Sequence, residues 1–223
     1  RRVDCHAMIA LPFDVTMELD GWRLFWARLE AEQPDEAALA GLRDRVATAA
    51  RSRFPSTAEI GSHPTVAALR RLFRAAGCDP TRYRPASEAL LRRLVKGDPL
   101  PRIHPLVDLN NCLSAELVVP CCVMSEGTFG RRMTGRSGRP GESYESLRGP
   151  FNLENKPVLF DEDGPLDTPI TGNVRVKVRQ DSSAAWLVAY MPAAELSHDD
   201  GRTTLEELAG TSGIAASVFD PSE

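Results

Sequence analysis

The chain has 223 residues, of which 42% are hydrophobic and 26% charged, and its formal net charge is −4. This length and composition suit a globular protein with one large domain or two small ones. No apolar run approaches the roughly 20 residues that a bilayer span needs, which excludes a membrane protein, and without a signal-peptide pattern the expected location is cytoplasmic.

The first half of the chain carries mainly helical patterns. Alternation over residues 3–11 favours a half-buried strand, whereas the aromatic and leucine side chains of residues 22–29 recur at helical spacing. Capping residues, prolines and glycines then delimit amphipathic segments. The predicted helices cover residues 34–53, 62–77, 84–97 and 103–117.

After Leu117 the hydrophobic period changes to two, which predicts strands. The expected strands are 118–124, a hairpin over 156–166, 174–179 and a central strand over 185–191. The Gly- and Ser-rich residues 134–149 read as a mobile loop or a paired edge, and a final outer helix is expected around 204–209. The predicted fold class is therefore α+β, with a mainly antiparallel β-sheet packed with helices.

Common cofactor and metal fingerprints are missing. The five cysteines include no CxxC pair, and the four histidines show no zinc spacing. The chain also lacks a P-loop, a dinucleotide-binding glycine pattern and a GxSxG motif. We therefore expect reduced thiols, no metal and no cofactor.

Basic residues are concentrated in one region of this acidic chain. Residues 63–102 contain nine basic and three acidic side chains. Such a stretch is a candidate anion-binding face. The alternative is that these arginines cover the solvated sides of amphipathic helices, and charge alone favours that alternative.

Two strings in the same region are more specific. RYRPASEALLRR (82–93) precedes LPRIHPLVDLNN (100–111) across a proline-rich joint. Together they resemble the free-standing relatives of the editing domain of the phenylalanyl-tRNA synthetase β-subunit, the B3/B4 module. The resemblance implies an α+β fold whose helix and sheet wall a pocket for the aminoacyl end of tRNA. It also implies one domain over 1–223, with a lead-in (1–61), a core (62–191) and a helical tail (192–223).

The family element R-I-N-P-x-V-D-x-x-N carries over to Arg102, Asp108 and Asn111, with His104 where the family most often has Asn. Asp108 is a candidate to bind the substrate amine or to orient a water, and Asn111 to assist it. The alternative is structural: both brace the proline-rich joint, with Arg102 as the partner of Asp108.

Cys122 is a candidate nucleophile. Pro120-Cys121-Cys122 stands where the synthetase domain has a pocket histidine. A thiol in a pocket wall can attack an ester, but an unactivated thiol is mostly protonated near neutral pH. The alternative is that Cys122 is a small buried filler.

The remaining candidates are basic side chains that could bind the RNA phosphates: Arg70, Arg71, Arg74, Arg92, Arg93, Arg175, Lys177 and Arg179. The resemblance implies that the protein binds tRNA or aminoacyl-tRNA and hydrolyses a mischarged amino acid from it in trans. The alternatives are a non-catalytic RNA-binding or amino-acid-sensing module, and hydrolysis of an ester or amide outside tRNA.

Overall fold

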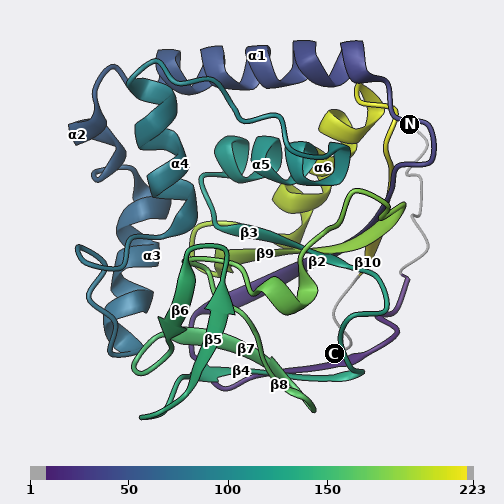
Figure 1. Ribbon diagram of the computed structural model, residues 1–223. Coiled ribbons are helices and arrows are strands. Elements are labelled where there is room, and N and C mark those ends of the chain that lie inside the picture. The colour runs from purple at the N-terminus through teal and green to yellow at the C-terminus, as the bar shows by residue number, and fades with distance from the viewer. Residues whose placement is uncertain (1–8, 220–223) are drawn as a thin grey trace, which may run out of the picture.

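A four-stranded antiparallel sheet forms the centre of the structure, a computed structural model that describes residues 9–219 (Figure 1). Its strands, in spatial order, are β10 (Ala215–Phe219), β2 (Trp22–Glu30), β9 (Ala184–Pro192) and β3 (Cys121–Ser125). Every residue of β9 after Ala184 is buried, as the apolar run predicted. β3 reaches the sheet edge next to β9 and carries Cys122 there.

Strand β2 occupies the segment that helical spacing assigned to a helix, and that prediction is wrong. Phe25 and Trp26 are consecutive and both fully buried, so the two faces of β2 are covered and no alternation marks the strand. Phe25 lies 5.0 Å from the ring of His198, and Trp26 lies 4.9 Å from the ring of Phe13.

A second sheet contains the predicted hairpin. Its order is β1 (Asp14–Met17), β4 (Arg132–Ser137), β7 (Pro157–Asp161) and β8 (Gly164–Asp167), and only the β1–β4 pair is parallel. Gly164 makes the β7–β8 turn at a φ of 125°, which favours glycine. The Gly- and Ser-rich segment is paired rather than loose: it forms β4 and enters a separate hairpin, β5 (Ser143–Ser146) with β6 (Gly149–Asn152).

The predicted helices of the first half are confirmed. They are α1 (Glu36–Arg53), α3 (Pro64–Ala75), α4 (Ala86–Val95) and α5 (Pro105–Leu117), together with the short α2 (Thr57–Ile60). In Figure 1, α1 and α5 lie above the central sheet, and α3 and α4 stand at its side. Within residues 9–219, no helix is long and apolar enough to cross a membrane.

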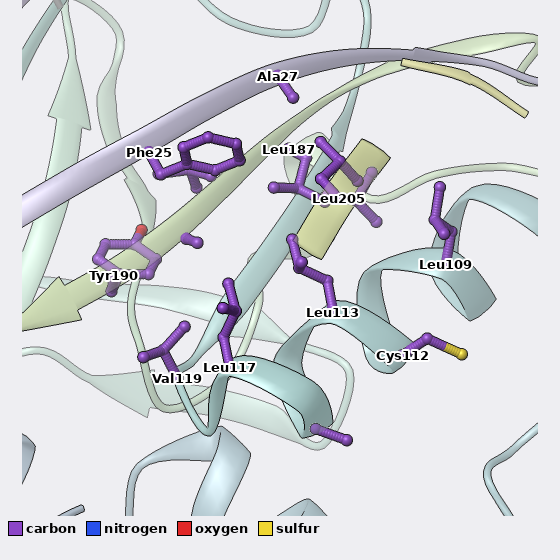
Figure 2. Packing of buried hydrophobic residues seen from close by; sticks show 14 of the residues in the cluster. Phe25, Ala27, Leu109, Cys112, Leu113, Leu117, Val119, Leu187, Tyr190 and Leu205 are labelled. Carbon is purple, nitrogen blue, oxygen red and sulfur yellow. The ribbon is translucent and has the colours of Figure 1, made fainter. Parts of the chain in front are cut away.

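Helix α5 is packed against the central sheet and two other helices, which positions the candidate site. Leu113 points from α5 toward Leu187 of β9, whereas Cys112 points away from that sheet (Figure 2). Helix α1 packs against α5 as well. Helix α6 (His198–Gly210) packs on α5 too, so the sheet, α1 and α6 together leave only a narrow part of the α5 surface for a ligand.

Two further expectations need correction. Residues 174–179 do not form a strand: Asn173 accepts a hydrogen bond from the Arg175 backbone N–H at 2.9 Å and starts a 3₁₀ turn, η1 (Val174–Val176). The C-terminal tail contains not only a helix, α6 (His198–Gly210), but also β10, which extends the central sheet beside β2. Most of the strand expected over residues 3–11 lies outside the described residues. The α+β class with mainly antiparallel sheets is confirmed.

Candidate functional site

A cleft of about 700 Å³ opens between the N-terminal half of α5, strand β3 and residues 172–180. Two of the large apolar side chains exposed in the described part of the chain, Ile103 (53%) and Leu147 (69%), stand at its rim. Exposed apolar side chains around a mainly apolar hollow are typical of a ligand site. The other lining residues are Val107, Asn110, Cys121, Cys122, Val123, Gly172, Asn173, Val176, Lys177, Val178, Arg179 and Gln180.

Asn110 is the polar group inside this cleft with unused bonding capacity. Its side chain is 5% exposed, and its Nδ2 donates to the Cys121 carbonyl at 3.4 Å. Its Oδ1 is buried and has no hydrogen-bond partner among residues 9–219. A buried carboxamide oxygen without a partner costs free energy, so it is suited to accept a hydrogen bond from a ligand.

Sequence reasoning chose Asn111 and missed its neighbour Asn110. Asn111 is half-buried and does not line the cleft. The signal that could have found Asn110 is its spacing: Val107 and Asn110 are three residues apart on α5, so they share one side of the helix, the side that borders the cleft and β3.

Asp108 lies beside the cleft rather than in it. Its side chain is 3% exposed and forms an ion pair with Arg43 of α1. Its other oxygen accepts from the backbone N–H groups of Ile103, at 2.9 Å, and His104, at 3.4 Å. Both carboxylate oxygens of Asp108 thus accept hydrogen bonds from the protein. The bond from the Ile103 backbone N–H fixes a residue at the rim of the cleft.

Arg102 is not the partner of Asp108, which corrects that detail of the structural alternative. Its side chain is 72% exposed and pairs with Glu36 at 3.0 Å. His104 caps α5 instead of lining the cleft: its Nδ1 accepts from the Leu106 backbone N–H at 3.3 Å. Burial lowers the pKa of His104, which keeps the ring neutral and able to accept.

Three consecutive residues of β3 line the cleft: Cys121, Cys122 and Val123. Burial raises the pKa of both thiols, and the Asp167 carboxylate beside Cys122 raises it further. Both thiols are therefore protonated at neutral pH, and a protonated thiol is a poor nucleophile. This chemistry favours the filler role of Cys122 over the nucleophilic one.

Asp167 is fully buried next to Cys122 and does not itself line the cleft. The Tyr190 hydroxyl donates to its Oδ2 at 2.6 Å, whereas no residue in the described part of the chain is a hydrogen-bond partner of its Oδ1. Burial raises the pKa of Asp167 from its ordinary value of 3.8 to about 7. The sequence contained no signal for this group, because one aspartate after a hairpin is unremarkable.

The raised pKa predicts that stability falls as pH rises. Below pH 4 the Asp167 carboxyl is protonated in both the folded and the unfolded chain; between about pH 4 and 7 only the folded chain keeps the proton. Relative to Asp167→Asn, the wild-type free energy of unfolding should therefore fall by about 2 to 3 kcal/mol between pH 5 and pH 8. Urea unfolding at both pH values measures this difference. Parallel pH profiles for the two proteins would contradict it.

The three basic side chains of the strand expected over residues 174–179 lie in two different places. Lys177 and Arg179 line the cleft, and neither side chain forms an ion pair with a described residue. Arg175 turns to the β7–β8 hairpin, where it pairs with Asp161 at 2.8 Å and Asp163 at 3.8 Å. The 3₁₀ turn explains this split, because residues 175, 177 and 179 share one face only in a continuous strand.

Arg70 and Arg71 lie away from the cleft. Arg70 forms a bidentate pair with Glu88, with nitrogen–oxygen distances of 2.7 and 3.0 Å. Arg84 and Arg92 also contact Glu88, whose side chain is fully buried. Arg71 is 64% exposed and reaches Glu195 at 3.6 Å. Of the predicted site residues, the structure thus brings Cys122, Lys177 and Arg179 together in the cleft.

Comparison with protein families identifies the chain. The family model described as "B3/4 domain" matches residues 68–206, which is more than half of the sequence. The chain belongs to the B3/4 domain family. No curated protein matches this B3/4 chain. Among solved structures it is similar to an N-terminal fragment of the phenylalanyl-tRNA synthetase β-subunit from Pyrococcus horikoshii, with 11% identity and a TM-score of 0.49. The alignment covers 94% of this chain and 51% of that fragment, so the chain spans about half of the fragment's length.

Every residue that lines the cleft lies inside the matched B3/4 region. The elements that support the cleft from outside that region are α1, β2 and β10. Helix α1 supplies Arg43 to Asp108, and β2 supplies the neighbour of β9 in the central sheet. The N-terminal residues of this B3/4 protein therefore hold the walls of the cleft in place.

Proposed function

We propose that the cleft binds the aminoacyl end of a tRNA and that the protein hydrolyses a mischarged amino acid from it in trans. The observation that carries this proposal is the unpartnered Oδ1 of Asn110 inside a mainly apolar cleft. An α-ammonium group donates hydrogen bonds, and an amide oxygen accepts them. The apolar walls, with Val107 and Val176, suit an amino-acid side chain beside that ammonium group.

Cations at the cleft match the other half of such a substrate. Lys177 and Arg179 lie within reach of the same hollow and carry no ion pair among residues 9–219. The 3′ end of a tRNA brings phosphates close to the ester, and lysine and arginine bind phosphates. Because charged tRNA is used in the cytoplasm, we propose that location as well.

The reaction would be an ester hydrolysis by water. The water oxygen forms a bond to the ester carbonyl carbon, the bond from that carbon to the ribose oxygen breaks, and a proton passes from the water to the ribose oxygen. Asn110 would hold the ammonium group and so fix the carbonyl carbon relative to that water.

A binding module without catalysis is the second candidate, and one observation favours it. The described residues that line the cleft include no aspartate, glutamate or histidine, and burial keeps both cysteine thiols protonated. General acid–base catalysis normally uses one of these side chains. Under this candidate the cleft and its amine site are retained for RNA binding or for amino-acid sensing.

A deacylation time course separates the two candidates. Correctly charged and mischarged tRNAs are compared, beginning with tyrosine on phenylalanine tRNA, and the release of the labelled amino acid is measured. Under the proposal, wild type releases one wrong amino acid. Asn110→Ala should slow the release about 10- to 100-fold, because a hydrogen bond to a charged group contributes about 1.5 to 3 kcal/mol.

Asn111→Ala is the matched control, since it removes the same side chain one position along α5 and outside the cleft. Its release rate should stay within about twofold of wild type. Equal rates for Asn110→Ala and wild type would refute the role of Asn110. Binding of tRNA without release from any substrate would support the non-catalytic module.

A further inference from the structure

A second hollow lies next to the cleft and is lined by arginines. It measures about 550 Å³ and runs between residues 82–93 and the β5–β6 hairpin. Figure 1 shows that hairpin standing beside α3 and α4. Four of the residues that line it are arginines: Arg82, Arg84, Arg93 and Arg148. None of the described residues that line it is an aspartate or a glutamate. We call this hollow the arginine groove.

The charge of the arginine groove is largely unneutralised. Arg93 and Arg148 are exposed, and neither forms an ion pair with a described residue. Arg82 lies 5.2 Å from the centre of the Tyr83 ring, and only Arg84 contacts a carboxylate, that of Glu88 at 3.1 Å. Arg70, which does not line the groove, binds the same carboxylate. Positive charges gathered in a concave surface without counter-charges favour a polyanionic ligand.

Aromatic rings line the same groove. Tyr83 and Phe151 are half-buried there, with ring centres 6.1 Å apart in an edge-to-face arrangement. Surfaces that bind single-stranded nucleic acid combine a basic groove for the backbone with aromatic faces for the bases.

The arginine groove continues into the cleft along two shared walls. Leu147 lines both hollows, and the next residue, Arg148, lines the groove. On the other wall, Ile170 and Thr171 line the groove, and the following residues 172–173 line the cleft. A strand lying in the groove is thereby directed with one end at the cleft.

We propose that the arginine groove binds the phosphate backbone of a single-stranded RNA end and directs its terminus into the cleft. This inference rests on the proposed function, because it takes the aminoacyl end to be the group that enters the cleft. Of the arginines that the sequence indicated it keeps Arg93 and leaves out Arg70 and Arg71, and it adds Arg148.

The test is a fluorescence-anisotropy titration of a labelled single-stranded RNA 12-mer over a range of salt concentrations. The double variant Arg93→Ala/Arg148→Ala should bind about tenfold more weakly at 0.1 M salt. The slope of log affinity against log salt should shrink by about 1.4, because each lost phosphate contact on a single strand removes about 0.7. A thermal melt of each variant checks that it is folded.

Arg45→Ala/Arg139→Ala is the matched control. It also removes two positive charges, from exposed arginines that line neither the groove nor the cleft and form no ion pair with a described residue. Its affinity should stay within about twofold of wild type and its salt slope unchanged. Equal losses in both double variants would overturn the inference, since the whole surface would then act as one diffuse charge. Equal competition by an RNA duplex of the same length would overturn it too.

Deacylation separates a failure of the groove from a failure of the function. If groove variants bind RNA like wild type while wild type still releases an amino acid, the groove assignment is overturned and the proposed function stands. If groove variants lose RNA binding while wild type releases nothing, the groove assignment stands and the hydrolytic function fails. If wild type does not bind the RNA at all, the groove assignment is overturned.

Discussion

Asp108→Asn is expected to lower the free energy of unfolding by about 3 kcal/mol. The substitution keeps the size of the side chain but removes the charge that faces Arg43, whose side chain is only 11% exposed. Removing one partner of a buried ion pair leaves the other charge without compensation, which costs about 3 to 5 kcal/mol. An amide at this position retains one acceptor for the Ile103 backbone N–H, which places the expected loss at the lower end.

Urea unfolding at pH 7 measures the loss, with Glu36→Gln as control. That control breaks the exposed pair between Glu36 and Arg102 and should change stability by less than about 1 kcal/mol. Adding Arg43→Met to Asp108→Asn should recover part of the loss, because the stranded charge is then gone. A variant as stable as wild type that no longer binds an amino acid would instead assign Asp108 to the substrate amine.

If Asp108 braces the fold, it still affects the cleft, through Ile103. The carboxylate accepts from the Ile103 backbone N–H, and Ile103 stands at the rim with 53% of its surface exposed. A family element can therefore be retained for the shape of a pocket without touching the ligand. The same element also contains Asn110, which faces the cleft itself.

The α+β fold could be predicted because most of its elements expose one face. Helix α4 shows the 3.6-residue period with Leu90, Leu91 and Leu94 buried, and its arginines lie on the exposed sides. Strand β2 gave the wrong period because it is buried on both sides, so its apolar residues follow one another without alternation. Alternation of apolar and polar residues marks a strand with one face in solvent, and a strand that is covered on both faces lacks this pattern.

The candidate site could be predicted only to the level of a chain segment. The string LPRIHPLVDLNN lies at the cleft, but the choice among Asp108, Asn110 and Asn111 depends on what covers each side of α5. That cover comes from α1, β9 and α6, which are distant in sequence. The sequence therefore lacked the tertiary contacts: Arg43 forms an ion pair with Asp108, whereas no described residue donates a hydrogen bond to the Oδ1 of Asn110.

Glu88→Gln tests the other buried charge cluster. Glu88 is fully buried and faces three arginines: Arg70, Arg84 and Arg92, each with a nitrogen within 3.1 Å of a carboxylate oxygen. Neutralising the single anion leaves three positive charges around a buried amide. We expect the free energy of unfolding to fall by about 3 to 5 kcal/mol, the usual cost of breaking a buried pair.

The control for Glu88→Gln is Glu126→Gln. Glu126 also forms a bidentate pair, with Arg28 at 2.6 and 3.0 Å, but its side chain is 43% exposed. Water can solvate Arg28 when that pair is lost, so this control should lose no more than about 1 kcal/mol. Equal losses in the two variants, measured by urea unfolding, would show that burial of Glu88 adds nothing. A larger loss in Glu88→Gln alone would mean that Arg70 is held for the fold, which leaves the RNA phosphates to arginines without a carboxylate partner.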